Sequence, residues 1–123
     1  MEFKPNYPIY LQVADFICEK VLTRAWRNGE KLPSVKDLSV MVSVNPNTVI
    51  KALAWLQENG ILITQRGIGY FLSEEAFELT LRLKRRKFIE EELPDVFASM
   101  ELLKLDVGDL VRLYEEAGSG EKV

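Results

Sequence analysis

A five-residue segment, Asn45-Pro46-Asn47-Thr48-Val49, carries the side chains best suited to recognition in this sequence. Asparagine favours the cap of an α-helix and proline its first turn, so a helix is predicted to begin here. Apolar residues recur at helical spacing from Val49 to Leu56, whereas Asn47 and Lys51 lie four residues apart on the opposite face. The apolar face of the helix is therefore expected to pack against the rest of the domain. The other presents an amide and an ammonium group where a DNA-binding domain presents its recognition residues.

A second, shorter helix is predicted upstream of this one. Ser34 and Asp37 have the three-residue spacing of a capping box, with Asp in place of the usual Glu or Gln. A tight turn at Ser43-Val44 joins the two helices. The order helix, turn, helix is that of a helix-turn-helix.

A β-hairpin is predicted to follow. Asn59-Gly60 ends the second helix, and strand-like runs cover residues 61–65 and 69–72. The segment Arg66-Gly67-Ile68-Gly69 connects them as a wing. The predicted fold class is mainly α with a small β-wing, and the winged helix-turn-helix domain is assigned to residues 1–72.

The other predicted elements are helices. Apolar positions from Ile9 to Val21 indicate a first helix that faces the core. A long charged helix is predicted from about residue 74 to residue 91. Pro94 interrupts it and starts a new helix, and Asp106 can cap a last short helix.

The C-terminal helices, residues 73–123, are assigned as a dimerisation region. They carry more apolar surface than so short a region can bury by itself, so we expect a homodimer. The residues expected at the interface are Phe77, Leu81, Phe88, Phe97, Met100, Leu103, Leu110 and Leu113. Little volume remains for a deep pocket, so an effector, of unknown identity, is expected at the dimer interface or between the two halves.

Composition argues against several classes of protein. The chain has 123 residues, no histidine and one cysteine, which disfavours zinc fingers, disulfide scaffolds and histidine-based acid–base catalysis. We expect no enzymatic activity, no catalytic residues, no metal and no cofactor. No apolar run approaches the roughly 18 residues of a membrane span, and the first residues lack the apolar stretch of a signal peptide. A cytoplasmic protein with no membrane partner is predicted.

The net charge of −3 is unevenly distributed. Residues 1–72 contain eight basic and six acidic side chains, a net charge of +2, whereas residues 73–123 contain eight and 13, a net charge of −5. Because neutralisation of phosphates dominates affinity for DNA, a domain at +2 should bind weakly as a monomer. We therefore expect DNA binding to depend on dimerisation, with the acidic half facing away from the duplex.

Four segments together resemble the winged helix-turn-helix domain of GntR-type bacterial transcription regulators. They are Pro8-Ile9-Tyr10-Leu11-Gln12-Val13, Gly29-Glu30-Lys31-Leu32-Pro33-Ser34, Val44-Asn45-Pro46-Asn47-Thr48-Val49 and Arg66-Gly67-Ile68-Gly69-Tyr70-Phe71. The resemblance spans residues 8–72 in order. The short helical remainder is similar to that of the YtrA-like subfamily, in which such helices are dimerisation elements.

The resemblance implies contacts with double-stranded DNA from the start of the first helix of the motif, the first half of the second, and the wing tip. The residues implied are Ser34, Lys36, Asn45, Asn47, Thr48, Lys51, Arg66 and Gly67. Lys36, Lys51 and Arg66 suit phosphates or guanine edges, and Asn47 suits adenine. Gly67 lets the wing backbone approach the minor groove.

Three positions depart from the family pattern. Many members carry arginine where this chain has Pro46 or Lys36, and a polar or basic residue where it has Ile50. Fewer bidentate contacts to guanine are then available. We expect an operator with adenine or thymine at some of the positions read, with Ile50 suited to a thymine methyl group.

Structural interpretations compete with several of these assignments. Ser34 and Asn45 can serve as helix caps alone, and Lys51 can be a solvated charge. The glycine-rich segment 66–69 can be an ordinary hairpin turn. For the basic run 82–87, pairing with Glu side chains on the same helix favours a solvated face over a second DNA patch.

The sequence therefore predicts a homodimeric, sequence-specific transcription regulator, a repressor that binds a palindromic operator. The alternative is a winged-helix module that mediates protein–protein interaction, which the small positive charge keeps open.

Overall fold

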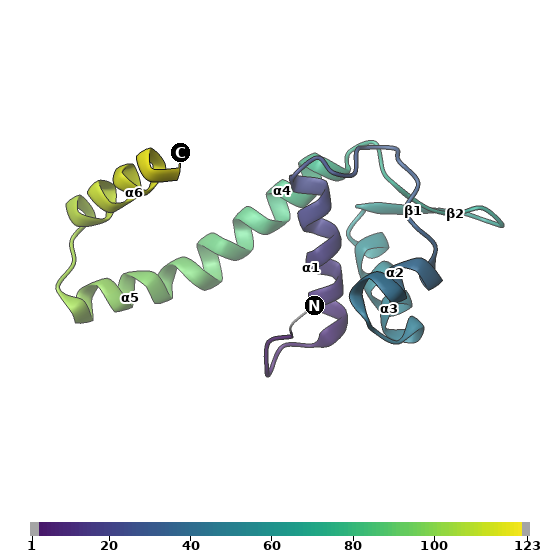
Figure 1. Ribbon diagram of the computed structural model, residues 1–123, viewed down its shortest axis with the longest axis horizontal. Helices are drawn as coiled ribbons and strands as arrows, with labels where there is room; N and C mark the ends of the chain where they lie inside the picture. Colours follow the sequence, from purple (N-terminus) through teal and green to yellow (C-terminus); the bar gives the residue numbers. More distant parts are fainter. Residues whose placement is uncertain (1–2, 122–123) are drawn as a thin grey trace. The chain divides into compact units, whose positions relative to one another are not determined.

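Within residues 3–121, the part of the chain that the computed structural model describes, there are six α-helices, one π-helical turn and one two-stranded antiparallel sheet. In chain order (Figure 1) they are α1 (Ile9–Leu22), α2 (Val35–Val42), α3 (Pro46–Glu58), β1 (Leu62–Gln65), β2 (Gly69–Leu72), α4 (Ala76–Lys87), the π-helical turn (Phe88–Glu92), α5 (Leu93–Leu103) and α6 (Val107–Glu121). The predicted fold class, mainly α with a small β-wing, is confirmed.

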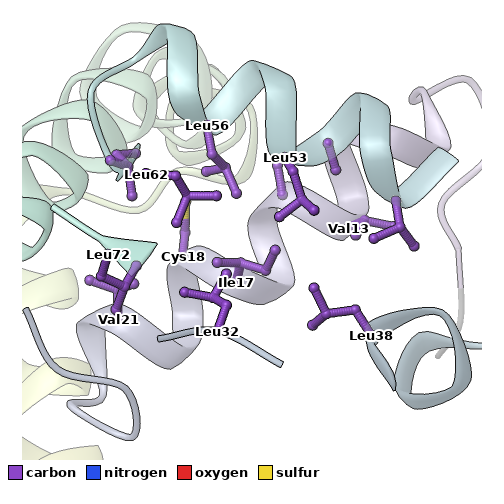
Figure 2. Close-up of a cluster of buried hydrophobic side chains, with 14 of the residues drawn as sticks. Val13, Ile17, Cys18, Val21, Leu32, Leu38, Leu53, Leu56, Leu62 and Leu72 are labelled. Atoms are coloured by element: carbon purple, nitrogen blue, oxygen red, sulfur yellow. The ribbon is translucent and has the colours of Figure 1, made fainter. Parts of the chain in front are cut away.

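The helix-turn-helix and the hairpin share one hydrophobic core around α1. Figure 2 shows Ile17 and Val21 of α1 near side chains from α2, α3 and the hairpin. The other fully buried residues of the cluster include Val13, Cys18, Leu38, Val42, Val49, Leu53, Leu56, Ile61, Leu62 and Leu72. Each buried Leu, Ile or Val side chain contributes about 1.5–3 kcal/mol relative to exposure. This cluster therefore fixes α3 against α1. Ile9, the first residue of α1, is 38% exposed and lies outside the cluster.

Polar side chains cap both helices of the helix-turn-helix, as predicted. Ser34 Oγ accepts a hydrogen bond from the N–H of Asp37 (3.1 Å), and Asn45 Oδ1 accepts one from the N–H of Asn47 (2.8 Å). Between the helices, Ser43 ends α2 in the left-handed conformation, with φ of 56°. The two helix starts are therefore locally determined, each by one side chain.

The β1–β2 hairpin forms the wing. Its antiparallel register ends at the pair Gln65–Gly69, and residues 66–68 make the tip. Gly67 has φ of +78°, a left-handed value that favours glycine. Nothing lies within 4 Å of the position that a Cβ atom would take on Gly67, so the tip is open to a partner.

The chain divides into two compact units, residues 1–83 and 84–123. The boundary predicted at residue 72 differs from this division, because α4 begins within the first unit. Ala76 and Thr80 of α4 are fully buried there. The first unit is therefore a winged helix-turn-helix extended by two turns of helix.

The start of α4 is held by residues that follow α1. The side-chain oxygen of Asn28 accepts a hydrogen bond from the N–H of Phe77 (3.0 Å). The guanidinium carbon of Arg24 lies 3.6 Å from the centre of the Phe77 ring. Phe77, which the sequence predicted at the dimer interface, also packs half-buried against the core, so its own chain covers part of this side chain.

A π-helical turn, Phe88–Glu92, connects α4 to α5. Pro94 lies in the first turn of a new helix, as predicted, but the interruption before it is the π-helical turn rather than a break. In an α-helix a proline ring clashes with the carbonyl group four residues earlier and donates no hydrogen bond. The wider π-helical turn accommodates Pro94 while the backbone stays helical.

α6 starts with a reciprocal capping box. The side chain of Asp106 accepts a hydrogen bond from the N–H of Asp109 (2.8 Å), and the carboxylate of Asp109 accepts one from the N–H of Asp106 (3.0 Å). The hydrogen bond from the backbone N–H of Asp106, together with a hydrogen bond from the Arg112 side chain, holds the pKa of Asp109 below its usual value. The predicted cap at Asp106 is present, but the helix that it starts is longer than expected, reaching Glu121.

Replacing Asn28 with alanine should lower the free energy of unfolding by about 0.5–2 kcal/mol, because the N–H of Phe77 loses its acceptor. Asn28→Asp keeps an acceptor oxygen in the same place and should stay close to wild type. Urea denaturation followed by circular dichroism, at one protein concentration for all three proteins, measures the difference. Equal losses in both variants would contradict a capping role for Asn28.

Candidate nucleic-acid interface

The eight residues predicted to contact DNA lie on three segments of the first unit. Ser34 and Lys36 are at the start of α2, Asn45, Asn47, Thr48 and Lys51 are at the start of α3, and Arg66 and Gly67 are at the wing tip. All are exposed except Thr48, which is half-buried. α2 packs against α3, and α3 leads into β1 (Figure 1). One core therefore positions all three segments.

Capping uses only part of the hydrogen-bonding capacity of Ser34 and Asn45. Their side-chain oxygens accept backbone N–H groups of α2 and α3. The hydroxyl group of Ser34 and the amide NH2 group of Asn45 can still donate hydrogen bonds. Phosphate oxygens are acceptors, so each residue can cap its helix and bind the DNA backbone at the same time.

The burial pattern of α3 defines its outward face. Val49, Ala52, Leu53 and Leu56 are fully buried. Asn47 is exposed opposite them, and its side chain can offer both a donor and an acceptor to an adenine edge. Ile50 is also exposed, which leaves its side chain available for apolar contact. α3 therefore has the amphipathic form expected of a helix that reads a groove.

Lys51 has a neighbour that its sequence position did not predict. Its Nζ lies 4.4 Å from the centre of the Tyr10 ring, which belongs to α1. An ammonium group within about 6 Å of an aromatic ring centre forms a cation–π interaction. The spacing of Asn47 and Lys51 in the sequence gives no sign of this contact, because it depends on how α1 packs against α3.

Ile68 at the wing tip is a second residue that was not among those predicted to contact DNA. It is 56% exposed and stands next to Gly67 and Arg66. A large apolar side chain at the end of a hairpin has no core to join. The sequence could have indicated Ile68, because it places an aliphatic residue between the glycines of a tight turn. Apolar side chains of this kind enter minor grooves in some DNA complexes.

The residues predicted for dimerisation fall into two groups. Phe77 and Leu81 are half-buried within their own chain, and Met100 is buried, with 8% of its surface exposed. The remaining five, Phe88, Phe97, Leu103, Leu110 and Leu113, are exposed. Helical spacing placed all eight on apolar faces, but only the packing separates the covered side chains from the open ones.

Neither a metal site nor a membrane span is found among residues 3–121. No cluster of three or more Asp, Glu, His or Cys side chains there is arranged to hold a metal ion. None of the helices in the described part of the chain is both long and apolar enough to cross a bilayer.

A comparison with protein-family models matches residues 9–72 to the model described as bacterial regulatory proteins of the gntR family. The match runs from the start of α1 to the end of β2, and so includes every residue predicted to contact DNA. The chain belongs to the GntR family. It is a transcription regulator that binds DNA through a winged helix-turn-helix.

Relatives that match most of the chain refine this placement. The uncharacterized helix-turn-helix regulator YhcF of Bacillus subtilis is 33% identical over 95% of this chain and 98% of that protein. The transcriptional repressor YtrA of the same organism is 39% identical over 83% of this chain and 82% of that protein. A GntR-family transcriptional regulator from Listeria monocytogenes has a similar structure, with a TM-score of 0.77, 28% identity, and coverage of 93% and 98% of the two chains. These matches support the YtrA-like subfamily.

The double role of Asn45 can be tested by substitution. Asn45→Asp keeps the cap of α3 but places a negative charge beside the DNA phosphates, so it should preserve the melting temperature and weaken DNA binding. Asn45→Ala should destabilise the protein by about 1 kcal/mol. Thermal unfolding and fluorescence anisotropy with labelled duplex measure the two effects. If Asn45→Asp bound DNA as wild type does, Asn45 would be a cap only.

Proposed function

We propose that the protein is a homodimeric repressor that binds a palindromic operator in the cytoplasm and blocks access of RNA polymerase to the promoter. The observation that carries the proposal is the exposed apolar surface of the second unit, described next. The repressor assignment is supported by the similarity to YtrA, which is a transcriptional repressor.

The second unit has too little core for the apolar side chains that it carries. Leu102 is 79% exposed, Leu103 65% and Tyr114 80%. Further exposed apolar residues of this unit are Phe88, Ile89, Val96, Phe97, Leu105, Val107, Leu110, Val111 and Leu113. Contiguous apolar patches are unfavourable in water and are typical of protein interfaces. A second copy of the same unit is the partner that we propose for this surface.

An open groove on the second unit fits the same role. It has a volume of about 320 Å³ and is lined by side chains of α5 and α6, together with Leu105 between them. The lining residues are Asp95, Val96, Ser99, Met100, Leu103, Leu105 and Leu110. Apolar side chains of a partner would fill such a groove. If a small-molecule effector exists, we place it at this interface rather than in a closed cavity.

Dimerisation accounts for how a domain with little positive charge binds DNA. The charge of +2 on residues 1–72 permits few phosphate contacts per copy. Two copies double these contacts. A two-fold symmetric dimer presents two recognition helices to half-sites that are inverted repeats, so a palindromic operator is the expected target.

The residues of the interface divide by chemistry. We assign base reading in the major groove to Asn47, with Ile50 against a thymine methyl group. Lys36 and Arg66 bind phosphates, and Gly67 brings the wing backbone to the minor groove. The donors of Ser34, Asn45 and Thr48 contact the DNA backbone.

Base reading by Asn47 predicts a selective loss. Asn47→Ala should weaken binding to the operator by roughly 1–3 kcal/mol and relax the preference at one or two positions, with binding to random duplex nearly intact. Lys36→Ala should instead weaken binding to the operator and to random duplex by similar factors. It should also reduce the steepness of the plot of log K against log salt concentration by about 0.9. An operator selected from a random pool, titrated alongside a random duplex over a salt series, provides the test. Unchanged base preference in Asn47→Ala would refute its reading role.

If the second unit forms the dimer interface, a charged side chain introduced on its apolar surface should weaken the dimer. Leu103→Glu should convert the dimer to a monomer at micromolar concentration, because the carboxylate would be buried in an apolar interface. Val40→Glu, a matched change at an exposed aliphatic residue of α2, should leave the dimer intact. Sedimentation velocity of both variants and wild type decides the question. A monomeric wild type would exclude the proposed dimer.

A further inference from the structure

Lys51 is the basic residue of α3, which contains no arginine, histidine or other lysine. Its ammonium group lies 4.4 Å from the centre of the Tyr10 ring. Any favourable contact between α3 and the DNA that needs a positive charge therefore depends on where this one group is held.

The two partners differ in freedom. Tyr10 is half-buried and packs against the hydrophobic core, so its ring has a fixed position. Lys51 is exposed and has a flexible four-carbon stem. The Tyr10 ring therefore favours one conformation of the Lys51 side chain among the many that an exposed lysine can adopt.

That direction leads to the flank of α3 on which α1 packs. An α-helix with its side chains is about 10–12 Å wide, close to the width of the major groove, about 12 Å. A recognition helix thus fills the groove, and base edges lie beneath its central face. A side chain held at the flank meets the phosphates that line the groove wall.

We propose that Tyr10 is a positioning residue, which holds Lys51 at the flank of the recognition helix so that Lys51 binds a DNA phosphate and leaves base reading to Asn47. This inference rests on the proposed role of the first unit in operator recognition. It chooses between the two partners, phosphate and guanine, that the sequence left open for Lys51. It also gives a residue of α1 an indirect role in DNA binding, through Lys51.

The test uses wild type and four variants of the full chain: Lys51→Gln, Tyr10→Phe, Tyr10→Leu and the double variant Tyr10→Leu/Lys51→Gln. Each is titrated with the selected operator and with random duplex over a salt series. Tyr10→Phe keeps the ring and removes only the hydroxyl group. Tyr10→Leu keeps an apolar side chain in the core and removes the ring, and thermal unfolding shows whether both variants remain folded.

Lys51→Gln should weaken binding to operator and random duplex by the same factor and lower the salt slope by about 0.9. Tyr10→Phe should bind as wild type does. Tyr10→Leu should weaken binding to both duplexes by about two- to fivefold, the value of an exposed cation–π contact, and should have no further effect when Lys51 is already glutamine. Relaxed base preference in Lys51→Gln, or an undiminished effect of Tyr10→Leu in the double variant, would overturn the proposal.

An NMR measurement without DNA tests the contact between Lys51 and the Tyr10 ring independently. The ring current of Tyr10 should shift the NMR signals of the Lys51 Hε protons upfield in wild type and Tyr10→Phe, but not in Tyr10→Leu. Ordinary shifts in all three proteins would overturn the pairing. These outcomes can be told apart from a failure of the proposed dimer. A monomeric wild type that prefers a single half-site would refute the dimer, and the Tyr10 and Lys51 variants could still be compared on that half-site.

Discussion

The burial of one face of α3 against α1 is the constraint on which the recognition surface depends. Val49, Leu53 and Leu56 have no exposed area, so α3 cannot rotate about its axis without bringing them into water. Each such side chain is worth about 1.5–3 kcal/mol, and together they exceed any single polar contact at the surface. The orientation of Asn47 toward solvent is therefore a consequence of apolar packing on the other side of the helix.

The features that the sequence predicted correctly are those determined over a few residues. The caps at Ser34 and Asn45 join groups two or three positions apart, and the turn at Gly67 needs only a residue that tolerates positive φ. Helix type and hairpin follow from periodicity in the same way. Contacts between distant segments were not predictable: the hydrogen bond from the N–H of Phe77 to Asn28 joins residues 49 positions apart.

The same distinction explains the C-terminal region. Periodicity showed that Met100 and Leu103 lie on apolar faces of a helix, but it does not say which neighbour covers each of them. In the structure Met100 is buried by its own unit and Leu103 is 65% exposed. Likewise, the start of α4 was assigned to the C-terminal region, although Ala76 packs in the core of the first unit. A helix with one apolar face contacts whatever the tertiary fold brings to it, and a single sequence does not encode that choice in its spacing.

The caps of α2 and α3 also bear on the thermodynamics of association. Immobilising a side chain at an interface costs about 0.5–1.5 kcal/mol of conformational entropy. Ser34 and Asn45 are already ordered in the absence of DNA, since each accepts a backbone hydrogen bond of its own helix. Their remaining donor groups are consequently preorganised, and most of this entropic cost is met during folding rather than during binding. The part of the surface that touches the nucleic acid should resemble a rigid template more than a segment that orders on contact.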